Sequence, residues 1–556
     1  MKRTHLLALG GFVCAWLTLS VPAEASDASA WAPSTEAIRF NLELMRSDDL
    51  LVAGERLRAL PAVHRFYEQR NFNAAWISAG RAKPQAAELV AAIQDAAADG
   101  LQPADYHVAP LQRLLARESL DTPEQEAELD LLLTDGFLTL ASHLQRGRLD
   151  PTALDQDWTL PRRSGDPLTE LTAALRDGDV AAHLRSLAPR HPGYERLKAA
   201  LATYRELARG EPWPRVPDGP ILRLDDLDPR VPVLRARLAA EFGATPEPLL
   251  AEHYDWPLVE QVRTFQRRHG LADDGAVGPD TLAALNVTAA ERVRQILVNL
   301  ERWRWLPDSL GERHIRVNVA DFSMELVDGG ELVMRKRVIV GKSMQRTPVF
   351  SGRLSYLVLN PSWEVPAEIA GKEILPLIQK DPKYLEKHDM QVLQGWGATE
   401  RLIDPASVNW SQVSATNFPY RLRQRPGALN PLGRVKFMFP NQYAVYMHDT
   451  SARGLFARSK RAFSHGCIRV EDPLELAEWL LRNGGYKSGD RLIKTVLASG
   501  DEQVVTLSRA VPVHLLYWTA WVDDDGVIQF RHDLYGRDQR AELALLEQSA
   551  PGSEDS

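Results

Sequence analysis

The sequence predicts a multidomain α+β protein in which two helical parts precede a β-rich part. Its 556 residues exceed what one hydrophobic core usually serves, so we expect about three domains. Apolar residues recur at helical spacing up to about residue 312, and from residue 313 onward they alternate with polar residues, as in strands. A segment rich in proline and glycine, residues 216–233, separates the two helical parts and predicts a linker.

The composition is that of an ordinary globular protein, with 44% hydrophobic and 25% charged residues. The formal net charge of −8 leaves no expected basic surface for phosphate backbones, so we expect no nucleic-acid partner. The same charge disfavours binding to an anionic membrane surface, and any membrane contact should be peripheral at most.

Residues 1–25 have the pattern of a signal peptide. Lys2 and Arg3 precede an apolar run from Leu6 to Val21, and an A-x-A cleavage pattern follows at residues 23–25. We therefore expect export. An uncleaved membrane anchor is the alternative, although the apolar run is short for a spanning helix. Cleavage would remove one of the two cysteines of the chain and leave Cys467 alone.

Residues 31–215 predict a helical scaffold domain. The segment 86–98 has Leu89, Val90 and Ile93 on one helical face, and the segment 124–144 is a longer and more apolar helix. No pattern in this region is typical of a catalytic site, so we interpret it as structural. The linker at 216–233 follows it.

Residues 234–290 predict a small unit of three helices. The stretch from Phe265 to Pro279 resembles the three-helix peptidoglycan-binding domain. It has the Phe265-Gln266 pair, the Asp274-Gly275 turn, the Val277-Gly278-Pro279 step and then Thr281-Leu282. The resemblance implies a module that binds the cell wall. The alternative is a helical spacer that has lost its affinity, because these residues are mainly the packing and turn positions of the fold.

The β-rich part follows a connecting helix predicted over residues 291–312. We expect a catalytic domain over residues 313–503, with strands interrupted at 367–432 by a segment of little periodicity. An insertion of that size often covers a substrate site, so we name it the capping insertion. Residues 504–556 predict a C-terminal segment that packs on the body and ends in a disordered tail.

Cys467 lies in the stretch Phe-Ser-His-Gly-Cys-Ile-Arg-Val at residues 463–470. A lone thiol in an oxidising compartment has no disulfide partner, so its retention indicates a chemical role; the alternative is a small buried hydrophobe. A helix predicted to begin at Asp472-Pro473 would favour the thiolate through its dipole. Gly466 allows a tight backbone approach that leaves an N–H facing a reacting carbonyl.

Two histidines are candidates for the proton-transferring base. Neighbours in an extended segment point to opposite faces, so His465 is better suited to orienting the loop by hydrogen bonds. His448 ends a predicted strand upstream, and we predict that it acts as proton acceptor and donor. The alternative for each is a structural histidine. The spacings of His and Cys fit none of the usual zinc patterns, so we expect no metal.

The residues Tyr446-Met447-His448-Asp449-Thr450, followed by Ser464 to Val470, resemble the active-site signature of the YkuD-type L,D-transpeptidases. This likeness extends from Ile315 to about Val504. Together with the N-terminal region, the wall-binding unit and the capping insertion, it resembles the large multidomain YcbB-like branch. Many family members have Asn where this chain has Arg469, and that branch commonly has Arg.

The resemblance implies a reaction in the periplasm without a cofactor. The Cys467 thiolate would attack a tetrapeptide stem between meso-diaminopimelate and D-Ala, and His448 would protonate the departing D-Ala. The thioester would pass to the side-chain amine of a second stem and give a 3→3 cross-link. Backbone N–H groups and Tyr446 would hold the oxyanion, Ser464 would bond within the loop, and Arg469 would contact a substrate carboxylate.

The resemblance also implies carbapenem acylation of Cys467 and partnership with other cell-wall synthases. Two alternatives keep the same Cys467 and His448: the thioester passes to water, as in an L,D-carboxypeptidase, or to a lipoprotein lysine. An alternative of another class is a non-catalytic wall-anchoring protein with a vestigial thiol. That reading predicts loss of Cys, His or the loop Gly, and the sequence keeps all three.

Overall fold

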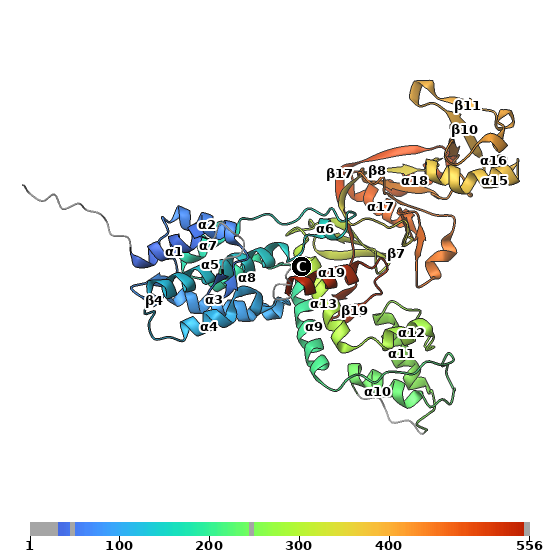
Figure 1. Cartoon of the computed structure of the whole chain (residues 1–556). Coiled ribbons are helices and arrows are strands. Elements are labelled where there is room, and N and C mark those ends of the chain that lie inside the picture. Colours follow the sequence, from blue (N-terminus) through green and yellow to red (C-terminus); the bar gives the residue numbers. More distant parts are fainter. Residues whose placement is uncertain (1–31, 45–50, 244–249, 487, 550–556) are drawn as a thin grey trace, which may run out of the picture.

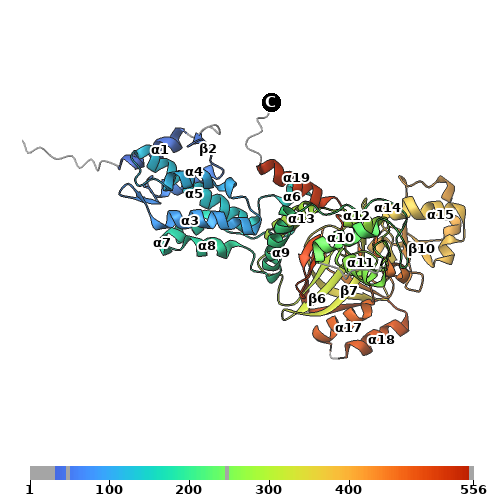
Figure 2. The same cartoon turned by 90° about the horizontal axis from the view of Figure 1, so that it is seen from below.

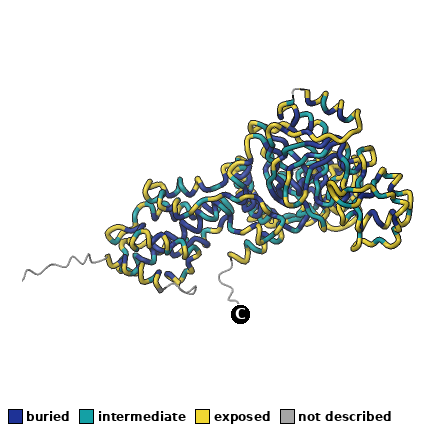
Figure 3. Tube along the Cα trace, turned by 90° about the horizontal axis from the view of Figure 1, so that it is seen from above, coloured by how far each residue is buried: buried dark blue, intermediate teal, exposed yellow. Residues whose placement is uncertain are grey.

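A computed structural model describes residues 32–44, 51–243, 250–486 and 488–549. The chain forms a helical lobe, a small helical unit and a β-barrel-like body from which the capping insertion projects (Figure 1). Buried residues concentrate inside the barrel and the helical lobe (Figure 3). The predicted fold class, a helical scaffold with a three-helix unit and a β-rich domain, is confirmed. The predicted signal peptide and the tail from residue 550 lie outside the described residues.

The helical lobe is built around α5 (Pro123–Arg146), whose central turns are buried on nearly every side. A helix that is buried on nearly every side must be surrounded by other elements. Those around it are α1 (Pro33–Leu44), α2 (Leu60–Gln69), α3 (Pro84–Asp95), α4 (Val108–Leu115), α7 (Pro167–Asp177) and α8 (Val180–Leu187). Two hairpins, β1 (Leu51–Val52) with β2 (Glu55–Arg56) and β3 (Ile77–Ser78) with β4 (Arg81–Ala82), complete the lobe, and α6 (Pro151–Leu154) packs on the core of the body.

Helix α9 (Pro192–Arg209) packs on α13 (Ala289–Arg304) and shares its hydrophobic core with the barrel. The last helix of the region predicted as the scaffold therefore belongs to the core of the body. Helical periodicity predicts that α9 exists, but it does not reveal which of two cores its apolar face joins. The predicted connecting helix, 291–312, ends earlier, at Arg304.

The small unit has the three predicted helices, α10 (Val231–Phe242), α11 (Trp256–Arg268) and α12 (Pro279–Leu285), around one core. Gln266 is buried at its centre, where its Oε1 accepts from Gly275 N at 2.8 Å and its Nε2 donates to Ala276 O at 2.9 Å. This glutamine therefore holds the turn that precedes α12, which is a folding role.

Nine strands form the barrel-like sheet, in the order β15-β7-β16-β14-β13-β8-β17-β5-β6, and a further β6–β7 pairing closes it. The strands are β5 (His314–Asn318), β6 (Ser323–Asp328), β7 (Glu331–Gly341), β8 (Ser351–Leu359), β13 (Val435–Met438), β14 (Met447–His448), β15 (Ala462–Ser464), β16 (Ile468–Val470) and β17 (Gln503–Leu516). Helices α17 (Pro473–Asn483) and α18 (Gly489–Ser499) lie together on one side of the barrel (Figure 2).

Strand β17 crosses the predicted boundary between residues 503 and 504, with only its first residue before it. This strand is 14 residues long and lies inside the sheet, antiparallel to β8 and parallel to β5. Its pairing with β8 shifts register between Thr506 and Val511, which breaks the alternation that the sequence analysis relied on. The hairpin β18 (Ala520–Val522) with β19 (Ile528–Phe530) and helix α19 (Arg537–Ser549) follow it.

The capping insertion has a sheet and a core of its own. Its strands run in the order β11-β10-β12-β9, and its core includes Ile374, Ile378, Val392 and Leu422. The elements are β9 (Trp363–Glu364), α14 (Ala367–Ile369), the π-helix η3 (Ala370–Ile374), α15 (Leu375–Lys380), α16 (Tyr384–Lys387), β10 (Met390–Gln394), β11 (Arg401–Ile403) and β12 (Arg421–Gln424). The insertion thus begins at β9, slightly before residue 367, and short strands replace the irregular region that was expected.

Candidate active site

Strand pairing brings the predicted site residues to one face of the barrel. β14 lies between β13 and β16, with His448 opposite Lys436 on one side and Arg469 on the other. The backbone N–H of Ile468 donates to Tyr446 O at 3.0 Å, which extends the parallel register by one residue. Paired residues share a face and successive residues alternate, so the side chains of Tyr446 and Cys467 lie on the same face as that of His448.

The thiol of Cys467 is surrounded by groups that act on it in opposite directions. Burial is the largest effect and raises its pKa, while the backbone N–H and hydroxyl of Tyr446 and the charges of Lys436 and Arg469 lower it. The net direction is upward, so the resting group near neutral pH is the thiol. Its sulfur lies 3.9 Å from Ala444 O.

The sequence-based reason for a thiolate is wrong. Strand β16 separates Cys467 from Pro473, the first residue of α17, and a helix dipole weakens beyond its first turn. Asp472 adopts φ +41° and makes no side-chain capping hydrogen bond. The groups that stabilise negative charge on the sulfur therefore come from neighbouring strands instead of the following helix.

His448 is 5% exposed and its tautomer is fixed by the backbone. Its Nδ1 lies 2.5 Å from the carbonyl oxygen of Asp449, and a carbonyl only accepts, so Nδ1 carries the proton. Burial, followed by the positive charge of Arg469 and the weaker effect of Lys436, lowers the pKa of His448 to about 3. The imidazole is therefore neutral near pH 7, and its Nε2 is available as a proton acceptor.

The cysteine loop, residues 463–467, is held by hydrogen bonds to its backbone. Gly466 adopts φ +113°, a conformation that L side chains rarely adopt. Its N–H donates to Ser464 Oγ at 3.1 Å, and the Ser464 hydroxyl donates to Cys467 O at 2.5 Å. Ser464 thus bonds within the loop through both its oxygen and its hydroxyl hydrogen.

Thr347 and Tyr535 also support this loop, and sequence reasoning missed both. The Thr347 hydroxyl donates to Gly466 O at 2.8 Å and accepts from Gly341 N at 3.0 Å. The Tyr535 hydroxyl accepts from Thr347 N at 3.2 Å and donates to Gly341 O at 2.7 Å. Both residues are far from Cys467 in sequence, so no local pattern could have connected them to it.

His465 points to the capping insertion. Its Nε2 lies 2.6 Å from Glu373 Oε1, and Glu373 belongs to the π-helix η3. The predicted supporting role of His465 was hydrogen bonding that orients the loop. The structure gives it a hydrogen bond to the capping insertion, which connects the cysteine loop to the element that was expected to cover the substrate.

Lys436 is a further site residue that sequence reasoning missed. Its Nζ lies 3.9 Å from the centre of the Tyr446 ring, whose centre is 5.5 Å from that of His448. Burial lowers the pKa of Lys436, and the negative charge of an ionised Cys467 opposes that shift. Lys436 alternates with the buried Val435 and Phe437, which is also the pattern of a strand residue that faces water, so no local signal distinguished it.

Within the part of the chain that the structure describes, His, Cys, Asp and Glu form no group of three or more that could hold a metal ion. None of the described helices has both the length and the apolar character needed to cross a membrane.

Comparisons with known proteins identify the class of protein from its three parts. Family models match residues 61–201 ("Scaffold domain"), residues 228–285 ("Putative peptidoglycan binding domain") and residues 312–505 ("L,D-transpeptidase catalytic domain", YkuD). The chain is thus a multidomain protein with a peptidoglycan-directed module beside a catalytic domain. Its residues 312–505 are similar to the YkuD family of L,D-transpeptidase catalytic domains.

A curated relative supports this assignment. It is named "Putative L,D-transpeptidase", comes from Haemophilus influenzae, and is 37% identical over 253 residues, which are 46% of this chain and 50% of the relative. The chain therefore spans about half the length of the relative it matches.

Two solved structures were also matched. An L,D-transpeptidase from Xylanimonas cellulosilytica has 16% identity and a TM-score of 0.17, covering 54% of this chain and 98% of that one. An L,D-transpeptidase from Stackebrandtia nassauensis has 11% identity and a TM-score of 0.20, covering 55% of this chain and 97% of that one. TM-scores this low carry no argument about either fold or function.

Proposed function

We propose that this protein is a cysteine-dependent L,D-transpeptidase that forms 3→3 cross-links between peptidoglycan stem peptides. One observation carries the proposal: the parallel register of β14 and β16 sets His448, with Nδ1 bonded to a carbonyl, on the same face as Cys467. A nucleophile beside a base that a third group orients is the arrangement that acyl transfer requires. Without that register, the thiol would be an ordinary buried cysteine.

In the proposed acylation, the Cys467 sulfur attacks the carbonyl carbon between meso-diaminopimelate and D-Ala while its proton moves to His448 Nε2. The oxyanion accepts hydrogen bonds from backbone N–H groups of the cysteine loop and from the Tyr446 hydroxyl. The C–N bond then breaks, His448 gives its proton to the departing D-Ala amine, and the stem remains on Cys467 as a thioester.

Transfer follows the same steps in reverse with a different amine. The side-chain amine of a second stem attacks the thioester carbonyl and loses a proton to His448, and the sulfur leaves and recovers that proton. Lys436 and Arg469 stabilise negative charge on the sulfur and the oxyanion during both steps, because opposite charges interact strongly in a water-poor site. Arg469 is also our candidate for contact with a stem carboxylate.

The acceptor distinguishes this proposal from its nearest alternatives. Water as acceptor would make the enzyme an L,D-carboxypeptidase, and a lipoprotein lysine would make it an attachment enzyme, both with the same Cys467 and His448. The hydrogen bond between His465 and Glu373 favours an amine acceptor, because the capping insertion then lies against the cysteine loop and limits the access of water.

A reaction with purified components tests the proposal. The full chain is incubated with disaccharide-tetrapeptides, and the products are identified by mass. Cross-linked dimer with release of D-Ala supports transpeptidation, whereas tripeptide alone supports hydrolysis. The Cys467→Ser variant is the matched control, since it keeps the size of the side chain, and full activity in that variant would refute the proposal.

Carbapenem labelling tests the nucleophile separately. We expect one covalent adduct on Cys467 in the wild type and none in Cys467→Ser. An adduct on another residue would contradict the assignment of Cys467 as the nucleophile and would leave the description of the fold unchanged. Export to the periplasm and assembly with other cell-wall synthases belong to the same proposal, and they are tested by fractionation and by co-purification.

A further inference from the structure

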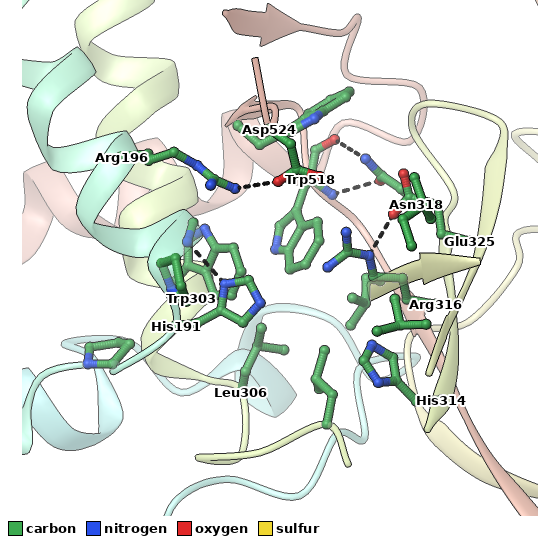
Figure 4. A pocket seen from close by; sticks show the side chains of 18 of the residues that line it. His191, Arg196, Trp303, Leu306, His314, Arg316, Asn318, Glu325, Trp518 and Asp524 are labelled. Carbon is green, nitrogen blue, oxygen red and sulfur yellow. Dashed lines mark hydrogen bonds and ion pairs between the residues drawn. The ribbon is translucent and has the colours of Figure 1, made fainter. Parts of the chain in front are cut away.

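A large cavity lies away from the candidate active site. It has a volume of about 650 Å³ and is enclosed by the start of α9, the end of α13, strands β5 and β6, and the turn that follows β18 (Figure 4). None of the candidate active-site residues lines it. Strand β7 takes part in both regions: its Leu332 and Arg335 line the cavity, whereas its Ile339 pairs with Arg469, so the cavity and Cys467 lie toward different ends of that strand.

One wall of this aromatic cavity is a stack of three rings. The centres of His191 and Trp303 are 4.6 Å apart with planes at 28°, and those of Trp303 and Trp518 are 4.6 Å apart at 24°. Figure 4 shows these rings side by side along the cavity. The wall therefore offers apolar ring surface on which a ligand can pack.

The opposite wall and the rim consist of ion pairs. Arg316 Nε lies 2.5 Å from Glu325 Oε2, and Arg196 lies 2.9 Å from Asp524 (Figure 4). The complete lining contains five arginines and six carboxylates, so its charges nearly balance. Because the cations are matched by carboxylates, the cavity has no strong preference for an anion or a cation. Paired Arg and Glu still present both donors and acceptors to a ligand.

We propose that the aromatic cavity binds a saccharide, and that its ligand is the N-acetylated glycan backbone of peptidoglycan. The identity of the polymer rests on the function proposed above; the ligand class rests on the lining. A pyranose ring has apolar C–H faces that stack on indoles, and each of its hydroxyls both donates and accepts a hydrogen bond. A neutral cavity with an aromatic wall and an ion-paired wall matches both properties, and its volume is in the range of small-molecule sites.

The aromatic cavity would give the enzyme a second binding site for its own substrate. Glycan bound in the aromatic cavity carries stem peptides on the same polymer, so a stem would reach Cys467 at a high effective concentration. We therefore expect the cavity to affect reactions on polymeric substrate and to have no effect on small soluble stems.

The test uses the full chain with Cys467→Ser, so that binding is measured without reaction. The probe is glycan strands freed of their stem peptides, with isothermal titration calorimetry as the readout. The cavity variant is Arg316→Met with Glu325→Gln, which removes both charges of one pair. The matched control is Arg313→Met with Asp328→Asn, an ion pair at 2.8 Å on the same two-stranded edge but outside the lining.

We expect the cavity variant to bind glycan strands at least 10-fold more weakly than the control variant. The peptidoglycan-binding unit is present in both, so its contribution cancels in the comparison. Hydroxyl-radical footprinting of the parent Cys467→Ser chain gives a second measurement that does not depend on how the variants fold. We expect the glycan to protect Trp518 and Trp521. Equal affinity of the two variants, or indoles without protection, would overturn the proposal.

The same variants with Cys467 intact separate this inference from the proposed function. On soluble disaccharide-tetrapeptides we expect both variants to release D-Ala at the wild-type rate. If no variant and no wild-type protein reacts, the transpeptidase proposal fails while glycan binding is still decided by calorimetry. If the reaction proceeds but the glycan does not bind in the cavity, only the present inference fails.

Discussion

Thr347 offers a sharp test of how the cysteine loop is held, because one hydroxyl serves two buried backbone groups. Replacing Thr347 by Val keeps the shape of the side chain and removes that hydroxyl. Gly466 O then loses its donor and Gly341 N loses its acceptor. A buried polar group left unsatisfied costs about 1–3 kcal/mol, so the two together predict a loss of about 2–6 kcal/mol.

This loss of stability should be easier to detect at the Gly341 amide than in the unfolding of the whole chain. A multidomain protein does not unfold in one step, so a single melting temperature is a poor measure. Hydrogen exchange of the Gly341 amide reports the lost bond directly, and we expect it to accelerate by about 10-fold or more, since about 1.4 kcal/mol corresponds to a factor of ten. D-Ala release should fall by about 100-fold if the sulfur is displaced by about 1 Å.

Thr347→Ser is the matched control. It keeps the hydroxyl and loses one methyl group, which costs about 1 kcal/mol of packing. We expect near-normal exchange at Gly341 and D-Ala release within a few-fold of the wild type. If the Val and Ser variants are equally impaired, then packing and not hydrogen bonding explains the role of Thr347. If the Val variant behaves like the wild type, the loop is held by other contacts and our reasoning is wrong.

Four further predictions concern the thiol and its surroundings. Alkylation of Cys467 by iodoacetamide, followed against pH without substrate, should give an apparent pKa above that of a small free thiol, because burial raises it; an apparent pKa below that value would contradict the neutral resting state. Lys436→Met should raise this apparent pKa further and Lys436→Arg should not, and identical titrations would remove Lys436 from the site. Glu373→Gln should raise KM a few-fold with little change in kcat, since an exposed pair with His465 contributes at most about 1 kcal/mol; a large fall in kcat would assign this pair a chemical role. Tyr535→Phe should lower kcat and accelerate exchange at Gly341, and wild-type values for both would show that its hydroxyl is dispensable.

The sequence predicted those helices and strands that are determined by the spacing of apolar residues close together in the chain. The change of period at residue 313 falls within one residue of the first strand of the barrel, and the three short helices of the small unit lie where apolar spacing and Pro279 indicated. Elements held by long-range pairing crossed the predicted boundaries. The place of β17 between β8 and β5 is set by residues more than 100 positions earlier, and α9 joins the core of the body although it precedes the small unit in sequence.

The candidate site could be predicted only in its motif residues. The lone thiol and the strand ending at His448 both stand out in the sequence, and the register of β14 with β16 then sets their side chains on one face. Thr347, Tyr535 and Lys436 were missed, since each reaches the site from a separate element. The helix dipole was invoked for Cys467 because the sequence does not show that a strand intervenes.

The resting state of the pair follows mainly from burial. Removing water from Cys467 raises the pKa of the thiol, and removing it from His448 lowers the pKa of the imidazole to about 3, so both effects favour the neutral pair. At pH 7 a base with a pKa of about 3 is protonated in roughly one molecule in ten thousand. A preformed thiolate–imidazolium pair is therefore a minor species in the free protein, and the proton must move to Nε2 as the carbon–sulfur bond forms.

Two kinds of thiol reagent should react with Cys467 at different rates. A simple alkylating agent needs the thiolate that burial suppresses, so it should label Cys467 slowly. An acylating agent with a strained carbonyl, such as a carbapenem, develops an oxyanion that Tyr446 and the nearby cations stabilise as the bond forms, and it should react faster. The two rates, measured at one pH, should both converge on those of a free thiol in urea. A rate advantage for the carbapenem that persists in urea would show that the site geometry contributes nothing.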